Sequence, residues 1–378
     1  MPAGIPTEAP AAVWYKHGED AIIEQRPVPS VSDLKPGEVS QVFNILNLSR
    51  LFSSLPTLPL KCLIRLLYTG VCHSDLSNSN NIYGRPGPLP MIFGHEGSGH
   101  VVAIGQGTKT SLKIGDRVGV KYIQDACLEC EMCRKGYESS CFNGTEQSGN
   151  TVMGTFQHYC VSFTKYVTPI PEGIGMDEAA PVLCAGVTVL RGIKEAQLSI
   201  GDWVAVPGAG GGLGHLAVQY AIALGYRVVG IDTGPEKQKL IESYGGNFLD
   251  FRKEENIVAS IKKVTDGRGA HAAIVSAASE AAYTSASDYL RDRGSLIIVG
   301  LPANAELRLP ILETALRGIK VVGCYVGNRQ DAVEALQLHA SGRAKLLYEL
   351  ERLENVNQIL ARLHAGKVTG RVVIDMTQ

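Results

Sequence analysis

The sequence predicts an α/β protein of two domains, one rich in short strands and one built on a doubly wound parallel sheet. Three observations support this prediction. The length of 378 residues exceeds what a single core usually serves. Residues 14–119 read as short strands broken by clusters of glycine, proline and asparagine. Beyond Asp177, strands instead alternate with helices, which is typical of a parallel sheet covered on both faces.

The two predicted domains are interleaved along the chain. One comprises residues 1–180 and 325–378, and the other comprises residues 181–324. The apolar segment RVVIDM near the end is a strand that we expect to return to the first domain. The other expected elements are strands at residues 63–71 and 100–104, strands in WVAVPG, YRVVGID, HAAIVSAAS and GSLIIVG, and helices at residues 213–224 and in EKQKLIESY.

Charge and composition argue against a nucleic acid or a membrane as the partner. The chain carries 36 basic and 37 acidic residues, so it has no excess charge to attract a polyanion or an anionic lipid surface. The N-terminal residues lack the basic and apolar segments of a secretory signal, and no apolar run reaches the roughly 18 residues of a membrane span. We therefore expect a soluble, cytoplasmic protein.

A glycine-rich turn, GAGGGLG, lies between an apolar strand and an apolar helix. Glycines there permit a tight turn and let a pyrophosphate approach the helix N-terminus, where unpaired N–H groups stabilise negative charge. The next strand ends at Asp232, whose carboxylate can accept hydrogen bonds from both adenosine ribose hydroxyls and repels a 2′-phosphate. The combination predicts a Rossmann fold that prefers NAD to NADP. The alternatives are a flexible loop for the glycines and plain solvated surface for Lys237, which otherwise supports the ribose.

Four of the nine cysteines crowd into one short segment with the spacing C-x2-C-x2-C-x7-C. Thiolates so spaced can turn toward one point and form a tetrahedron of soft donors, which is typical of zinc. Four protein ligands leave no open position, so we expect a structural zinc in a lobe at residues 125–142. An iron–sulfur cluster and unpaired buried cysteines are the alternatives. The four residues are Cys127, Cys130, Cys133 and Cys141.

Three residues far apart in the sequence are candidate ligands of a second, catalytic zinc. A zinc ion that acts as a Lewis acid needs three protein ligands and one exchangeable position. Cys72, His95 and Cys184 each lie among glycines or small side chains. Asp75 can accept the second N–H of a ligating imidazole, and Glu96 can approach the metal. Taken alone, the three candidates are explained as well by core packing, Asp75 by a turn cap, and Glu96 by a salt bridge.

Together these motifs resemble those of the zinc-containing alcohol dehydrogenases of the medium-chain family, most closely the fungal, yeast-type enzymes. The resemblance covers nearly all of residues 11–39 and 63–378. Its motifs are GVCHSD, GHEGSG, the four-cysteine run, AAPVLCAG, GAGGGLG with GID, YVGNR, and GKVTGR with Arg371. It implies a GroES-like, β-rich catalytic domain joined to a Rossmann domain.

The resemblance also implies an activity and a ligand set. The expected enzyme transfers a hydride from a primary or secondary alcohol to NAD, or from NADH to an aldehyde or ketone. Its catalytic zinc is held by Cys72, His95 and Cys184, with Glu96 as an alternate ligand. The family further implies a homotetramer or a homodimer.

Roles around the cofactor follow from the same resemblance. It implies that His73 faces the pyrophosphate, that Ser74 contacts the substrate oxygen and carries its proton outward, and that Thr188 packs at the nicotinamide. For Thr188, Val299 and Leu301, ordinary core packing is the alternative. The residues implied to line the dinucleotide are Gly211, Gly212, Leu213, Asp232, Lys237, Val299, Leu301 and Arg371.

Three positions near these motifs depart from the family pattern. Ser77 stands where relatives often carry a histidine that ends the proton relay, so we expect the relay to end in water or at another base and the pH dependence of turnover to be weaker or shifted. Tyr83 and Tyr122 stand where two tryptophans narrow the substrate pocket of ethanol-oxidising relatives. Since tyrosine is smaller and carries a hydroxyl, we expect a substrate larger or more polar than ethanol, such as a metabolite of a specialised pathway.

Residues 40–62 are the larger departure. The family pattern would run Val39 directly into Leu63, as one strand that leads to Cys72. The extra segment is either a tolerated surface loop, because closing a longer loop costs only about 1 kcal/mol, or a translated intron. It leaves open a different class of function, a non-catalytic NAD-binding protein inactivated by the insertion. A polyol or aromatic-alcohol dehydrogenase of the same family is a further alternative.

Overall fold

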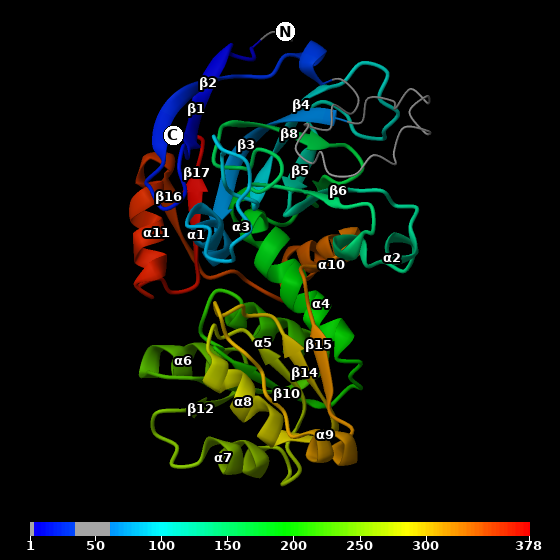
Figure 1. Ribbon diagram of the computed structural model, residues 1–378, viewed down its shortest axis with the longest axis vertical. Helices are drawn as coiled ribbons and strands as arrows, with labels where there is room; N and C mark the ends of the chain where they lie inside the picture. Colours follow the sequence, from blue (N-terminus) through cyan, green and yellow to red (C-terminus); the bar gives the residue numbers. More distant parts are fainter. Residues whose placement is uncertain (1–3, 35–60) are drawn as a thin grey trace.

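The computed structural model describes residues 4–34 and 61–378 and shows two stacked halves (Figure 1). The upper half is built mainly on strands, and the lower half is a sheet flanked by helices. Strands near both ends of the chain, β1 (Glu8–Val13) and β17 (Arg371–Asp375), lie in the upper half, and helix α4 (Val187–Glu195) runs between the halves. Within the described ranges, no helix is long and apolar enough to cross a membrane.

The upper half contains a seven-stranded sheet with the order β16-β17-β3-β4-β5-β9, and β8 pairs with β3. Strand β17 is the segment predicted to return to the first domain, and it pairs antiparallel with β3, with Val372 opposite Val71. The other strands are β3 (Lys61–Val71), β4 (Gly97–Ile104), β5 (Arg117–Val120), β8 (Tyr159–Phe163), β9 (Thr168–Pro169) and β16 (Tyr348–Arg352). Two-stranded sheets pair β1 with β2 (Ile22–Pro27) and β6 (Ile123–Ala126) with β7 (Thr145–Gln147).

The lower half contains a six-stranded parallel sheet with the order β12-β11-β10-β13-β14-β15. The strand order reverses between β10 and β13, and such a switch point is where open α/β sheets bind their ligands. Each strand and helix predicted in this part of the sequence forms. The strands are β10 (Trp203–Pro207), β11 (Arg227–Asp232), β12 (Asn247–Asp250), β13 (Ala270–Val275), β14 (Leu290–Ile298) and β15 (Lys320–Gly323). The helices are α5 (Gly214–Ala223), α6 (Pro235–Ser243), α7 (Ile257–Val264), α8 (Glu280–Tyr289) and α9 (Ile311–Arg317).

One apolar cluster joins the two halves. It brings side chains of α3 (Met176–Pro181) and α10 (Arg329–Ala340) together with side chains of α4, α5 and β10. Helix α4 contributes Leu190 and Ile193, whose spacing of three places them on one helix face. A second apolar cluster packs strands of the upper half against α11 (Val356–His364). A third cluster lies on the other face of the lower sheet. The site described below therefore lies between two halves that share a core.

Most of the segment at residues 40–62 lies outside the described residues, so neither explanation for it is tested. Its last two residues do lie in β3: Lys61 pairs with Phe163, and Cys62 pairs with Ile104. From Lys61 to Val71 the strand is continuous. The ladder bonds that an insertion inside this strand would remove are therefore present from Lys61 onward.

Candidate active site

Four potential metal ligands converge between the two halves. Cys72 follows β3 and precedes α1 (His73–Ser79), while His95 and Glu96 precede β4. Cys184 lies in a π-helical turn, Val182–Gly186, between α3 and α4. One donor atom from each of the four residues lies within 4.8 Å of the others, and all four residues are buried. Extra-residue turns of this kind often occur at functional sites, and here the turn carries the thiol of Cys184.

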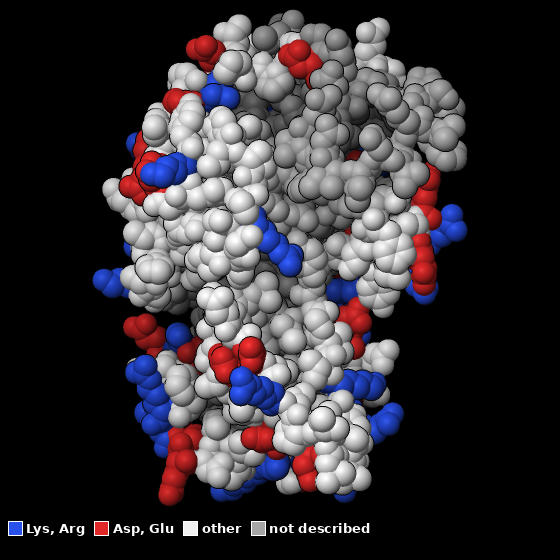
Figure 2. All heavy atoms as spheres, viewed as in Figure 1, with Lys and Arg blue, Asp and Glu red and all other residues white. Residues whose placement is uncertain are grey.

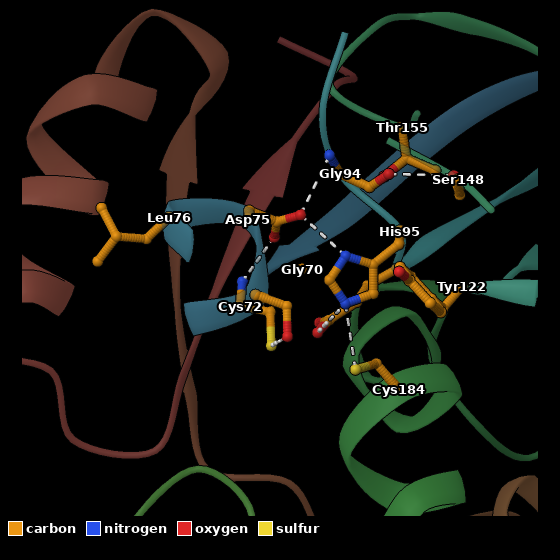
Figure 3. Close-up of polar contacts among 12 residues, drawn as sticks. Gly70, Cys72, Asp75, Leu76, Gly94, His95, Tyr122, Ser148, Thr155 and Cys184 are labelled. Atoms are coloured by element: carbon orange, nitrogen blue, oxygen red, sulfur yellow. Dashed lines mark hydrogen bonds and ion pairs between the residues drawn. The ribbon is translucent and has the colours of Figure 1, made fainter. Parts of the chain in front are cut away.

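Asp75 holds the imidazole of His95 (Figure 3). Oδ1 of Asp75 lies 2.8 Å from Nδ1 of His95 and also accepts a hydrogen bond from the Gly94 amide, while Oδ2 accepts one from the Cys72 amide. Because Nδ1–H donates to the carboxylate, Nε2 directs its lone pair toward Cys184, whose Sγ lies 3.3 Å away. Asp75 thus both caps the start of α1 and orients the imidazole.

The two buried thiols of this cluster differ in acidity. A hydrogen bond from Cys184 holds the pKa of the Cys72 thiol well below its ordinary value, with help from the positive charge of Arg371. The same pairing, together with burial, raises the pKa of Cys184. The cluster therefore favours an ionised Cys72, which is the form that binds a metal.

Glu96 is buried beside the cluster and is only partly satisfied. Oε1 pairs with the guanidinium of Arg371, whereas Oε2 has no hydrogen-bond partner among the described residues. Burial raises the pKa of the Glu96 carboxyl to about 7, although Arg371 opposes this shift. Gly70 makes room for this carboxylate, because a Cβ at that position would overlap it. The predicted salt bridge exists, and the oxygen that makes it, Oε1, also lies 3.9 Å from Nε2 of His95.

This donor set fits a zinc ion. Two thiols, one imidazole nitrogen and one carboxylate oxygen are the ligand types that zinc takes, and here they face one another in a buried space. A buried carboxylate oxygen without a partner is costly unless a cation or a donor satisfies it. The sequence identified Cys72, His95, Glu96 and Cys184, and the structure brings all four together.

The four cysteines of the lobe form a second cluster. Sγ of Cys127 lies 3.5 Å from Sγ of Cys141 and 3.9 Å from Sγ of Cys133, and Sγ of Cys130 lies 3.9 Å from Sγ of Cys141. Backbone N–H groups of the loop lower the pKa of Cys127 and lower the pKa of Cys130 to about 6. None of the nine cysteines is in a disulfide. The lobe therefore presents free thiols around one point, and these also suit zinc.

The glycine-rich turn lies at the start of α5, beside the end of β11. Gly208 adopts a φ of +80°, a conformation that residues with a Cβ rarely take. The Gly210 amide donates to Oδ2 of Asp232 at 2.9 Å, and Oδ1 of Asp232 pairs with Nζ of Lys237 at 2.7 Å. Gly212 packs closely against Gly370 and Arg371 of the other half. The predicted acidic residue, its lysine and the glycines therefore form one local unit.

The remaining residues that the resemblance places around the cofactor differ in burial and in their contacts. His73 is exposed at the start of α1, and Oγ of Ser74 lies 3.7 Å from Sγ of Cys72. Thr188 is buried and donates its hydroxyl to the carbonyl of Cys184. Val299 is buried as core packing would have it, but Leu301 is 53% exposed, so core packing is the wrong explanation for Leu301.

One tyrosine, Tyr122, lies against the metal-ligand cluster. The ring of Tyr122 meets His95 edge-on at 5.4 Å, and its hydroxyl donates to Oε1 of Gln147 at 3.0 Å. Tyr83 lies further out and donates to the carbonyl of Leu301 at 3.3 Å. Sequence reasoning assigned no role to Tyr325 of the YVGNR motif, whose ring meets Tyr122 at 5.9 Å. The only sequence signal for Tyr325 was its place in the YVGNR motif, and a motif does not show which residues are in contact in the fold.

Comparison with known proteins shows which family this chain belongs to. A family model described as a zinc-binding dehydrogenase matches residues 212–341, and one described as an alcohol dehydrogenase GroES-like domain matches residues 59–172. The alcohol dehydrogenase of Schizosaccharomyces pombe is 39% identical over 375 residues, covering 99% of each chain. The chain belongs to the zinc-containing alcohol dehydrogenase family.

Other members of this alcohol dehydrogenase family agree. Alcohol dehydrogenase 1 of Emericella nidulans is 41% identical over 376 residues, again 99% of each chain. A solved alcohol dehydrogenase of Aeropyrum pernix superposes with a TM-score of 0.81 at 28% identity, covering 97% of this chain and 99% of that one. These matches confirm the predicted α/β fold with its GroES-like and Rossmann parts and the prediction of an NAD- and zinc-dependent alcohol dehydrogenase. They give no support to the alternative of a non-catalytic NAD-binding protein.

Proposed function

We propose that Cys72, His95 and Cys184 are the ligands of a catalytic zinc, with Glu96 as an alternate ligand. The observation that supports this most strongly is the convergence of four different donors from three distant segments within 4.8 Å. When bound, zinc supplies a Lewis acid that acidifies an alcohol, and NAD supplies the hydride acceptor. We assign the zinc site and the NAD site to neighbouring positions at the boundary between the two halves.

The residues around this cluster orient and balance the donors. Asp75 keeps the proton on Nδ1 of His95, so Nε2 stays available as a ligand. Arg371 pairs with one oxygen of Glu96 and holds the carboxylate beside the cluster while the second oxygen stays free. Ser74 is the group that takes the alcohol proton outward. With Ser77 in place of a histidine, the proton then passes to water or to another base.

The cofactor is assigned to the glycine-rich turn and its surroundings. Asp232 receives the ribose hydroxyls and disfavours a 2′-phosphate, with Lys237 in support. His73 faces the pyrophosphate, and Thr188 lies at the nicotinamide. The further residues of this site are Gly211, Gly212, Leu213, Val299, Leu301 and Arg371. The proposed cofactor is therefore NAD(H).

The substrate is proposed to be a primary or secondary alcohol larger or more polar than ethanol. Tyr122 supports this because its ring lies against His95 while its hydroxyl is tied to Gln147. Tyr83 is 44% exposed and donates to the carbonyl of Leu301, and we assign it to the outer part of the substrate pocket. A polyol or an aromatic alcohol is the alternative substrate within the same family.

The four-cysteine lobe is proposed to hold a structural zinc. Cys127, Cys130, Cys133 and Cys141 leave no open ligand position, so a metal there stabilises the lobe and does not react with substrate. The unpaired state of all nine cysteines supports a reducing, cytoplasmic location. We also propose the domain division at residues 1–180 with 325–378 and at 181–324.

The lower half carries a surface that suits a second copy of the chain. Strand β15 is the edge of the parallel sheet, and the neighbouring helix α9 exposes Ile311 at 88%, Leu312 at 67% and Leu316 at 73%. Figure 2 shows a largely uncharged area where Figure 1 places α9. An apolar surface beside an unpaired sheet edge favours self-association. We therefore propose a homodimer or homotetramer, and Leu316→Glu should reduce the mass measured by light scattering.

A panel of alcohols tests the proposed activity. Purified protein is assayed with ethanol, hexanol, benzyl alcohol and sorbitol, with NAD or NADP, before and after treatment with a zinc chelator. We expect NAD-dependent turnover that the chelator abolishes, a lower kcat/KM with NADP, and a higher kcat/KM for a larger or more polar alcohol than for ethanol. Turnover that survives complete zinc removal would overturn the metal assignment, and ethanol as the best substrate would overturn the substrate assignment.

A further inference from the structure

Residues 345–347, the last part of the connection between α10 and β16, are held by side chains instead of by regular structure. Gln219 accepts a hydrogen bond from the Lys345 amide and donates one to the Lys345 carbonyl, both at 2.9 Å. The Leu346 amide donates to Oε1 of Glu178 at 2.8 Å, and the Leu347 amide donates to Nε2 of a buried histidine, His215, at 3.2 Å. We call this set of contacts the clasp. Two of its side chains, those of His215 and Gln219, come from α5 of the cofactor half.

His215 differs from the rest of the clasp because it also touches the glycine-rich turn. Its Nδ1 lies 2.9 Å from the carbonyl of Gly211, which can only accept, so Nδ1 carries the proton and Nε2 accepts from Leu347. Burial lowers the pKa of His215 to about 4, so the neutral ring that both bonds require is the form present near neutral pH. Gln219 has no side-chain contact of this kind with the turn among the described residues.

Beyond Leu347 the contacts continue to the ligand cluster. The Leu347 carbonyl accepts a hydrogen bond from the Arg371 amide at 2.9 Å. The side chain of Arg371 pairs with Glu96, which lies beside His95. The ring of His215 therefore stands between the turn assigned to the pyrophosphate and the backbone that positions Arg371.

We propose that His215 is a positioning residue that ties the glycine-rich turn to the half of the molecule that carries the catalytic ligands. By fixing that turn, it sets where the cofactor lies relative to Cys72, His95 and Cys184. This inference rests on the proposed function, because it takes the turn to be the cofactor site. Purely structural clamping is the rival explanation, and Gln219 provides a matched control, since it clamps the same segment without holding the turn.

Three variants separate these explanations. His215→Leu removes both ring hydrogen bonds, and His215→Gln keeps an amide that can donate and accept. Gln219→Leu removes two bonds to Lys345 and one to the carbonyl of His215, but none to the glycine-rich turn. The measurements are the dissociation constant of NADH by fluorescence titration, hydrogen exchange of the amides at residues 345–347, and zinc content. None of these needs a known substrate.

We expect His215→Leu to weaken NADH binding about tenfold, as the loss of one or two buried hydrogen bonds predicts, with zinc content unchanged. His215→Gln should return to within about threefold of the unaltered protein. Gln219→Leu should speed hydrogen exchange at Lys345 and leave NADH binding unchanged. Equal losses of NADH affinity in His215→Leu and Gln219→Leu, or no loss in His215→Leu, would overturn the inference.

Two controls complete the test. If His215→Leu does not fold, His215→Asn gives the same comparison, because its shorter side chain cannot span from Gly211 to Leu347. Failure of the unaltered protein to bind NADH would contradict the proposed function itself. Binding by the unaltered protein with an unaffected His215 variant would contradict only the role given to His215.

Discussion

The two ligand clusters use the same thiol chemistry in opposite settings. The cluster at Cys72 is assembled from three distant segments and is entirely buried, whereas the cysteine lobe draws its four thiols from one short stretch and is partly exposed. The first has charged neighbours, Asp75 and Arg371, in direct contact with its donors. In the second, backbone N–H groups of the loop contact the sulfur atoms.

This difference in setting indicates that the two zinc ions have different roles. A cluster of mixed donors with a partly free carboxylate can exchange one ligand. Through Arg371, which pairs with Glu96 and packs against Gly212, this cluster also lies next to the glycine-rich turn. A closed set of four thiols cannot exchange a ligand without losing the site, so its contribution is to stability. Changes in the first cluster should therefore affect catalysis, and changes in the second should affect folding.

The largest expected effect follows from Cys184→Ser. Loss of this proposed catalytic ligand should reduce kcat/KM by about a thousandfold or more, and the zinc content should fall from two to one per chain. Mass spectrometry of the metals and steady-state kinetics measure both. Cys324→Ser serves as the control, because Cys324 lies outside both clusters and should keep two zinc ions. Unchanged kinetics in Cys184→Ser would contradict the catalytic role that distinguishes the Cys72 cluster from the lobe.

Cys130→Ser should show the opposite pattern. Without its fourth thiol the lobe loses its zinc, and the thermal unfolding temperature should fall by about 10 °C, since structural zinc binding contributes several kcal/mol to folding. Activity per remaining zinc should stay within about threefold. Calorimetry and kinetics on the same sample check this. A loss of activity as large as that of Cys184→Ser, with the fold retained, would contradict a purely structural lobe.

Asp75→Asn tests how one hydrogen bond, between Asp75 and His95, affects metal affinity at the Cys72 cluster but not at the lobe. An amide can accept from Nδ1–H of His95 but carries no charge, so zinc affinity at the Cys72 cluster should fall by about 10- to 100-fold. The lobe should keep its metal, because among residues 4–34 and 61–378 no charged side chain is hydrogen-bonded to its thiols. Competition with a coloured chelator measures the two sites separately. Equal weakening of both sites would show that Asp75 acts only through the fold.

The smallest expected effect is at Ser77. Replacing this buried serine of α1 with histidine should restore an end to the proton relay, changing kcat by a few-fold and making its pH dependence steeper or shifted. Rates measured from pH 5 to 10 with NAD test this. A pH profile identical to that of the unaltered protein would remove Ser77 from the relay, while leaving both metal assignments intact.

Much of the site could be predicted from the sequence because its signals are local. The thiol spacing of the lobe, the glycine-rich turn and the strand that ends at Asp232 each lie within one short stretch of chain. The convergence of Cys72, His95 and Cys184 is not local, and it was predicted from the order of motifs that resemble a family. The structure adds that these donors do meet, in a buried space.

What the sequence could not supply are contacts between distant segments. Nothing near Gly70 in the sequence shows that its missing side chain leaves room for Glu96, and nothing near His215 indicates a bond to Leu347. The π-helical turn at Cys184 likewise depends on the packing of α3 and α4 against the rest of the fold. Such features follow from the final arrangement of the halves and leave no periodic pattern.

The central claim is that one chain holds two zinc ions in these two settings. Anomalous diffraction at the zinc absorption edge, from crystals of the protein purified without chelators, tests it most directly. Two peaks are expected, one among Cys72, His95 and Cys184 and one among the four cysteines of the lobe. A peak at the lobe alone, in protein that oxidises alcohols with NAD at full rate, would contradict the claim.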